Sequence, residues 1–388
     1  MRFSSFSDEW TTSLLKDSAS FYKGTGISKE ELSEEGHPCI LYGELYTTYK
    51  TEKIKDVKSK TSLPTEKLVK SKANDVIIPA SGETPIDIAT ACCIMNDDIL
   101  LGGDLNIIRI KKHNGVFLSC QLNGKRKLDI AKIAQGASIV HLHNDDLKKL
   151  KCYYPKTLCE EEKIVAFLSK IDERISTQSK IIDKLKSQMN YIIDNIIDYS
   201  APQFQFKDLY INAGEGGTPL TSNNLYYENG SIPFIKIEDL SNKYLNENKD
   251  FITEQGLKNS SAWIIPKNSI IYSNGATIGR ISINTYPVCT KQGILGIIPS
   301  RIVLTEYLYY FLRSIYFRKQ VHRITVKGTM DCAYLKDLNF IKCYIPALER
   351  QEKIIKSLRC LDEKILLEET ILNKLKEQKK FLLSNMFI

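Results

Sequence analysis

The sequence lacks the motifs that mark the common catalytic sites. It contains no GxxxxGK(S/T) phosphate-binding loop, no HExxH zinc motif and no GxSxG nucleophile elbow. The glycine-rich stretch NAGEGGTP is followed by Pro219, which cannot donate the backbone hydrogen bond that a phosphate cradle needs. We therefore predict that this chain is not an enzyme and holds no cofactor of its own.

Histidine and cysteine are also poorly placed for metal chemistry. There are 5 histidines, of which His141 and His143 alternate within a segment that resembles a strand. The 10 cysteines form no CxxC pair and show no regular spacing, which argues against both a zinc site and a disulfide scaffold. We expect no metal site, and thiols that stay reduced.

Long hydrophobic runs are absent as well. No stretch approaches the roughly 18 uninterrupted apolar residues of a membrane span, and MRFSSFSDEW lacks the apolar core of a signal peptide. We therefore predict a cytoplasmic protein, and the length predicts two or three domains. The net charge of +8 suits a polyanionic partner, although many basic soluble proteins have none.

The chain repeats itself with a period of about 190 residues. EEEKIVAFLSKIDERI, after Cys152, resembles ERQEKIIKSLRCLDEKI, after Cys343. Weaker similarity extends upstream, where Gly136 corresponds to Gly328. Because such a period is too long for a solenoid, it indicates a duplicated unit that consists of a variable region and a long helix.

Two long helices are predicted at corresponding places, within residues 155–200 and 346–388. Apolar residues recur alternately three and four positions apart in both, which is the pattern of a coiled-coil seam. We predict that the two helices pair antiparallel within one chain. The predicted seam consists of Ile164, Leu168, Ile171, Ile175, Gln178, Ile182, Leu185, Met189, Ile192 and Ile196 in the first helix, and of Ile354, Leu358, Leu361, Ile365, Glu368, Leu372, Leu375, Lys379, Leu382 and Met386 in the second.

Gln178 and Glu368 are polar residues at the same repeat position of this apolar seam. Polar groups in a seam cost stability but can fix the register and the choice of partner. They are equally consistent with a seam that is partly wet at its middle.

The variable regions, residues 1–154 and 201–345, are predicted to be mixed α/β domains. Apolar runs such as DVIIPA, SIIYS, RISI and GILGIIP have the length and flanking residues of strands. One helix is expected from Glu306 to about Val321, with a shorter counterpart near Phe117 to Asn123. The predicted fold class is α/β or α+β, with two such domains joined by two long helices in a pseudo-two-fold duplication.

Basic, aromatic and amide side chains concentrate in the loops of both regions. Tyrosine beside lysine, as in YGELYTTYK, suits contacts with phosphates and base edges, although a solvated loop can have the same composition. The candidate DNA-contacting residues are Lys23, Lys29, Tyr42, Tyr46, Thr47, Tyr49, Lys50, Lys125, Arg126 and Lys127 in the first region, and Thr218, Ser222, Asn223, Lys236, Asn274, Thr277, Lys291, Gln292, Arg323, Lys327 and Thr329 in the second.

Taken in order, these segments resemble the specificity subunits of type I restriction–modification systems. The first region contains FYKGTGISKEELSEEGHPCILYGELYTTY, VIIPASGETPIDIATA and LLGGDLNIIRI, and the second contains GGTPLTSNNLYYENGSIPFIKIEDL and IIYSNGATIGRISI. Both predicted helices carry EKI, DE and KLK in the family's order. The resemblance covers almost the whole chain.

The resemblance implies two target-recognition domains, each reading one half of a split double-stranded DNA target, with the paired helices as a spacer. It also implies two modification subunits, which bind S-adenosylmethionine and methylate adenine, and restriction subunits, which use ATP and Mg²⁺ to translocate and cleave DNA.

Two other classes of function compete with this interpretation. A coiled-coil adaptor with two domains for other ligands would have the same heptads, but the duplicated loop motifs do not favour it. An enzyme with an unrecognised site is the third possibility. Salt-dependent binding to duplex DNA distinguishes the first class from the other two.

Overall fold

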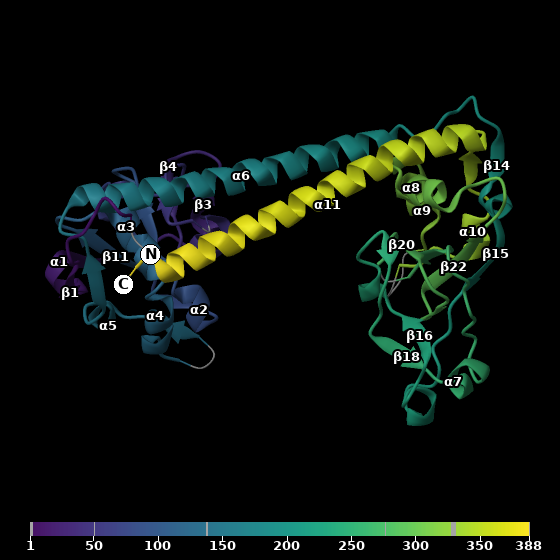
Figure 1. Cartoon of the computed structure of the whole chain (residues 1–388), viewed down its shortest axis with the longest axis horizontal. Coiled ribbons are helices and arrows are strands. Elements are labelled where there is room, and N and C mark those ends of the chain that lie inside the picture. The colour runs from purple at the N-terminus through teal and green to yellow at the C-terminus, as the bar shows by residue number, and fades with distance from the viewer. Residues whose placement is uncertain (1–2, 50, 137–138, 276, 327–330, 388) are drawn as a thin grey trace. The chain divides into compact units, whose positions relative to one another are not determined.

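The computed structural model describes residues 3–49, 51–136, 139–275, 277–326 and 331–387. Two long helices, α6 (Leu158–Asp194) and α11 (Leu348–Asn385), accompany the two variable regions (Figure 1). The chain forms two compact units, residues 1–180 with 369–388, and residues 181–368. Each unit therefore contains one variable region and one part of each long helix.

The first unit is built on a five-stranded sheet in the order β2-β11-β7-β9-β5. Its pairs are antiparallel except for the last, β9 with β5, which is parallel. The strands are β2 (Ala19–Lys23), β11 (Leu105–Ile110), β7 (Asp75–Pro79), β9 (Cys92–Ile94) and β5 (Lys53–Ile54).

Smaller elements of the first unit surround this sheet. A second sheet has the order β10-β4-β6-β3, with β10 (Leu100–Leu101), β4 (His37–Ile40), β6 (Ser59–Thr61) and β3 (Leu32–Ser33). Two-stranded pairs join β1 (Thr11–Leu14) to β13 (Lys151–Tyr154), and β8 (Ser81–Gly82) to β12 (Val140–His141). The helices are α1 (Leu15–Ser18), α2 (Pro85–Ile88), α3 (Gly115–Asn123), α4 (Lys127–Ile133) and α5 (Asn144–Leu147), with short turns η1 (Lys29–Glu31), η2 (Leu45–Tyr49) and η3 (Thr65–Lys67).

The second unit repeats this topology. Its five-stranded sheet has the order β15-β22-β19-β20-β17, and again only the last pair, β20 with β17, is parallel. The strands are β15 (Tyr210–Glu215), β22 (Ile294–Pro299), β19 (Ile270–Ser273), β20 (Ile281–Asn284) and β17 (Tyr244–Leu245). The same strand order and directions in both units confirm the internal duplication.

The remaining elements of the second unit also have counterparts in the first. A sheet β18-β16-β21 and a pair β14-β23 correspond to β6-β4-β10 and β1-β13. Their bounds are β18 (Asp250–Ile252), β16 (Ile232–Ile235), β21 (Cys289–Thr290), β14 (Gln203–Gln205) and β23 (Lys342–Tyr344). The helices are α7 (Glu254–Lys258), α8 (Thr305–Arg313), α9 (Ile315–Ile324) and α10 (Leu335–Leu338), with turns η4 (Phe206–Leu209), η5 (Asn224–Tyr226) and η6 (Ile237–Asp239).

The single helix expected from Glu306 to Val321 is wrong, because α8 and α9 are separate. Ser314 between them has an extended backbone, with φ −62° and ψ 150°, and its hydroxyl accepts a hydrogen bond from the Phe317 N–H. A serine that caps a new helix in this way competes with continuation of the old one.

The predicted seam of α6 and α11 is confirmed within each unit. In the first unit, Ile164 and Leu168 of α6 share a core with Leu382 and Met386 of α11. In the second unit, the C-terminal half of α6 shares a core with the N-terminal half of α11. The N-terminal part of each helix thus packs against the C-terminal part of the other, so the helices are antiparallel. At the C-terminal end of α6 the seam shifts by one residue from the predicted positions, because Ile193 is buried and Ile192 only partly so.

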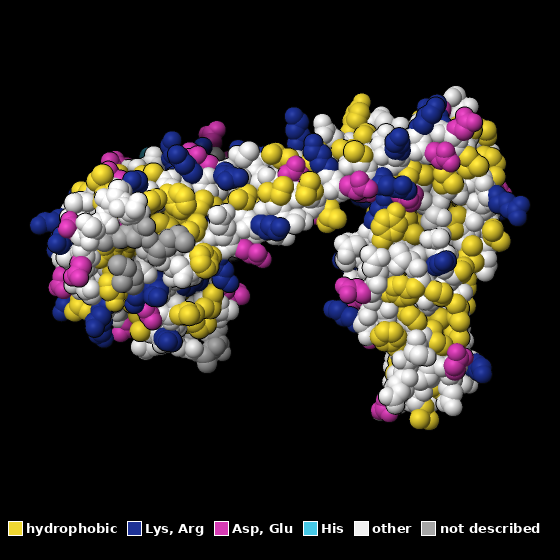
Figure 2. Space-filling model, in the orientation of Figure 1, with side chains coloured by type: hydrophobic (Ala, Val, Ile, Leu, Met, Phe, Trp, Pro, Cys, Tyr) yellow, Lys and Arg dark blue, Asp and Glu magenta, His cyan; other side chains and the backbone are white. Residues whose placement is uncertain are grey.

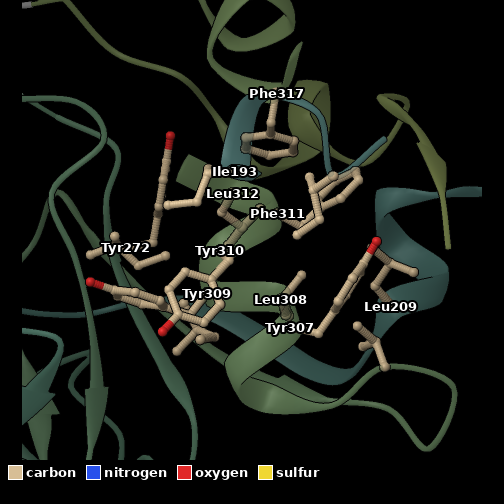
Figure 3. Packing of buried hydrophobic residues seen from close by; sticks show 14 of the residues in the cluster. Ile193, Leu209, Tyr272, Tyr307, Leu308, Tyr309, Tyr310, Phe311, Leu312 and Phe317 are labelled. Atoms are coloured by element: carbon tan, nitrogen blue, oxygen red, sulfur yellow. The ribbon is translucent and has the colours of Figure 1, made fainter. Parts of the chain in front are cut away.

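Aromatic residues dominate the core of the second unit. Tyr307, Tyr310 and Phe311 of α8 are fully buried; Phe311 packs against Phe317 of α9, and Tyr310 lies beside Tyr309 (Figure 3). Their burial contributes about 1.5–3 kcal/mol per large side chain, which fixes the α8–α9 pair against the sheet. No described helix combines the length and apolarity required to cross a membrane.

Candidate nucleic-acid interface

Several loops of the second unit meet at one end of its large sheet. The Gln292 N–H donates to Thr218 Oγ1 at 3.3 Å, which joins the loop after β15 to the loop before β22. The Asn274 N–H donates to the Gly293 carbonyl at 3.0 Å, which adds the loop after β19. The structure thus brings together the predicted residues Thr218, Asn274 and Gln292.

Not all of these residues are free to contact a ligand. Asn274 is 2% exposed, and its side-chain N–H donates to the Ala333 carbonyl at 3.2 Å, so it holds the loops together. Thr277, Lys291 and Gln292 are exposed on the same loops. These three side chains are therefore the best placed to reach a ligand.

Close backbone approach explains the glycines of NAGEGGTP. A Cβ on Gly216 would lie 2.1 Å from the Thr290 carbonyl oxygen, and one on Gly217 would lie 2.3 Å from Ser261 Oγ. Gly216 therefore lets the chain pass close to β21, and Gly217 lets it pass close to Ser261 and Ala262, which is a structural role.

Basic residues follow one edge of this loop cluster. Lys236 forms an ion pair with Asp250 at 2.8 Å, and the Lys291 N–H donates to the Ile235 carbonyl at 3.0 Å. Arg280, which the sequence pattern did not single out, donates to the Ile237 carbonyl at 3.4 Å. Its position directly after the loop SNGATIG was the available signal.

The other predicted residues of the second region lie elsewhere. Asn223 caps η5, because its side chain accepts a hydrogen bond from the Leu225 N–H at 3.1 Å. Ser222 is exposed in the same turn, and Arg323 is exposed in the last turn of α9. Lys327 and Thr329 lie outside the described residues.

In the first unit, two of the predicted tyrosines, Tyr46 and Tyr49, belong to the π-helical turn η2, and Tyr42 lies just before it. The Tyr49 hydroxyl accepts a hydrogen bond from the Lys58 N–H at 3.2 Å, and burial raises the pKa of Tyr49 to about 12. Tyr42 and Tyr46 are half-buried, and Thr47 is exposed, with its hydroxyl donating to the Gly43 carbonyl. Tyr49 therefore anchors the turn, while Tyr46 and Thr47 remain open to a partner.

The basic predictions of the first region separate into structural and exposed residues. Arg126 lies over the Tyr153 ring at 4.9 Å and pairs with Asp129 at 2.9 Å, a packing role. Burial lowers the pKa of Lys127. Lys23, Lys29 and Lys125 are exposed, and Lys50 lies outside the described residues.

The loop ends of both units are held by equivalent hydrogen bonds. The Leu142 N–H donates to the Ala80 carbonyl in the first unit, as the Ala333 N–H donates to the Asn274 carbonyl in the second, both at 2.9 Å. The frames are alike, whereas the exposed side chains differ. On the face shown in Figure 2, lysine and arginine alternate with aspartate and glutamate over both units.

Each unit also fastens its variable region to the long helices through a largely buried lysine. Lys379 of α11 contacts Asp172 of α6 at 2.6 Å and Glu52 at 2.5 Å. Burial alone would lower the pKa of Lys379, but the two carboxylates outweigh it and raise that pKa.

In the second unit the lysine comes from the variable region instead: Lys243 directly precedes β17, as Glu52 directly precedes β5. Lys243 contacts Asp362 of α11 at 3.1 Å and Glu306 at 2.9 Å. Asp172 and Asp362 are the aspartates of the repeated DE motif, so one helix position carries both links.

Burial makes several of the cysteines chemically unreactive. Burial raises the pKa of Cys93 and of Cys152 to about 12, and that of Cys39 and of Cys289 to about 11. These thiols are therefore protonated near neutral pH and poor nucleophiles. Over the described ranges, no three His, Cys, Asp or Glu side chains are grouped to hold a metal ion.

The duplicated domain-plus-helix fold is that of restriction–modification specificity subunits. The type I system S subunit from M. genitalium has a TM-score of 0.53 at 18% identity, covering 98% of this chain and 96% of that one. A structure described as showing complex assembly and conformational transition of the type I R-M system has a TM-score of 0.65 at 15% identity, covering 97% and 96%.

Residues 203–377 match the family described as the type I restriction modification DNA specificity domain. This segment and the relatives that the chain matches are those of type I specificity subunits, to which the chain is similar. A specificity subunit of Escherichia coli is 26% identical over 219 residues, which are 53% of each protein. One of Methanocaldococcus jannaschii is 33% identical over 164 residues, 42% of this chain and 38% of the relative. The matches thus span about half, or less, of these relatives.

Proposed function

We propose that this chain is the DNA-reading subunit of a type I restriction–modification complex and recognises a double-stranded target in two parts. The observation that carries the proposal is the duplication, in which two sheets of the same topology present equivalent loop ends with different exposed side chains. Two units with the same backbone topology but different exposed side chains suit two half-sites that differ in sequence.

The chemistry is assigned to partner subunits. Two modification subunits bind S-adenosylmethionine and methylate adenine, and restriction subunits use ATP and Mg²⁺ to cleave DNA, all in the cytoplasm. In this division the chain itself contributes binding and geometry: α6 and α11 form the spacer, and Lys379 and Lys243 fix a reader to it in each unit.

Methylome sequencing tests the proposal. A host without its own modification system receives the modification subunits either with or without this chain. We expect one methylated adenine motif, made of two short parts separated by unspecified bases, only when the chain is present. The same motif in its absence would assign target reading to another subunit. The purified chain alone should neither methylate nor cleave DNA.

A further inference from the structure

A basic hollow opens in the second unit between the β19–β20 loop and α9. Its volume is about 490 Å³. Arg280 lines one wall, and Arg318 and His322 of α9 line the other, above a floor that includes Tyr272 and Val321. Arg318 and His322 are four residues apart, so their side chains lie on the same face of the helix.

The two guanidinium groups are only lightly engaged by the protein. Arg280 donates one bond of 3.4 Å to the Ile237 carbonyl, and Arg318 lies 3.9 Å from Asp194 with 62% of its side chain exposed. Most of their N–H groups therefore face the hollow or solvent. Asp331 at the lining is the one described acidic residue among these groups. Asp194 is not among the lining residues, so two permanent positive charges line the hollow against one described carboxylate, that of Asp331, which favours an anion.

The first unit fills the corresponding space with protein. Its β7–β9 loop contains α2, which packs against α4, the counterpart of α9. Ile88 of α2 is fully buried there, in the same core as Ile130 of α4. In the first unit, apolar packing between α2 and α4 therefore stabilises this part of the fold. In the second unit, the corresponding space remains an open basic hollow.

We propose that this hollow binds one backbone phosphate of DNA beside the half-site read by the second region. The inference rests on the proposed function and adds to it a specific anchor. Arg280 continues from the loop that carries Thr277, so we expect a duplex that touches Thr277 to come near the hollow. Guanidinium groups match phosphate oxygens in shape and charge, and a phosphate contact fixes register without reading a base. Only the second half-site gains this anchor.

The test uses the full chain in complex with its modification subunits and duplexes that carry the methylome-defined target. In the variant, Arg280→Ala is combined with Arg318→Ala. We expect roughly tenfold weaker binding, with a slope of log K against log salt concentration that is smaller by about one. The methylated motif should stay the same. The control is Arg301→Ala. This exposed arginine follows the C-terminal end of β22, whereas Gln292 precedes the N-terminal end of the strand.

Neutral methylphosphonates at single positions of the DNA identify the contact. We expect one position, in the second half-site only, to weaken binding by the wild type and not by the double variant. Sensitivity of both proteins at every position, or an unchanged salt slope, would overturn the phosphate anchor. If the wild-type complex does not prefer the target to unrelated duplex, the proposed function itself fails, which is a different result.

Discussion

Glu161 and Gln351 occupy the same repeat position and perform the same task with different chemistry. Glu161 accepts a 2.8 Å hydrogen bond from the Asn114 N–H, before α3, and lies 2.6 Å from His113. Gln351 accepts a 2.8 Å bond from the Leu304 N–H, before α8. Both residues are fully buried. The shared requirement is an acceptor that ties the start of a long helix to its variable region.

Glu161→Gln should therefore be tolerated, with a loss below about 1 kcal/mol, because the amide keeps the acceptor. Glu161→Leu should cost about 2–3 kcal/mol, because it leaves the buried Asn114 N–H without its acceptor. Thermal unfolding of the full chain measures both. Equal losses in the two variants would show that the charge on Glu161, rather than its acceptor, matters.

Glu306 gives a pH-dependent contribution. Burial would raise its pKa, but hydrogen bonds from Arg359 and Lys243 outweigh burial and lower it. A carboxyl with a lowered folded-state pKa stabilises the fold above its unfolded pKa, and this contribution is lost as the pH falls through the folded pKa. Glu306→Gln should therefore lower the unfolding midpoint at neutral pH, and the difference from wild type should shrink in acid below the ordinary value of 4.5. A constant difference across pH would contradict this, and Glu247→Gln, an exposed site, is the control.

At the scale of elements, the long helices are held to their variable regions by buried charge. Lys379 is surrounded by Glu52 and Asp172, whereas Met189 stands at the corresponding position of α6. The apolar seam alone does not require a lysine there. The ion pairs therefore serve to fix how the first variable region sits on α6 and α11.

Lys379→Met should destabilise the first unit by about 3 kcal/mol, because the buried Glu52 and the partly buried Asp172 lose their shared cation. Adding Glu52→Gln and Asp172→Asn should restore much of this loss. Lys376→Met, at an exposed site of the same helix, should have little effect. Urea unfolding measures all of these variants, and a failure of the added substitutions to rescue would argue against charge as the cause.

The sequence predicts the elements whose pattern is local. The period of the seam locates α6 and α11, and apolar runs such as GILGIIP locate strands such as β22, because burial of one face imposes a spacing on the chain. The sequence pattern does not predict the break between α8 and α9, because that break depends on a single hydroxyl, that of Ser314, which caps α9. Nor does it distinguish Arg126, which stacks on the distant Tyr153, from the exposed Lys125, because that difference arises only in the tertiary fold.

For the whole molecule, the proposed spacer predicts a change in target spacing. Neither α6 nor α11 contains a glycine or proline within its bounds. Four residues inserted after Gln178 lengthen α6 by about 6 Å and rotate the C-terminal remainder of the helix by about 40°. At about 3.4 Å per base pair, we expect the gap between half-sites to grow by one or two base pairs while the bases of each half stay the same. An active variant with the original gap would contradict the spacer.

The central claim is that each variable region reads its own half of the target. The most direct measurement replaces residues 1–154 with the matching region of a relative that has a different target. The methylome is then sequenced in a host that supplies the modification subunits. We predict a hybrid motif, in which one half is that of the relative and the other half is unchanged. If both halves change together, or neither changes, the claim of two independent readers is contradicted.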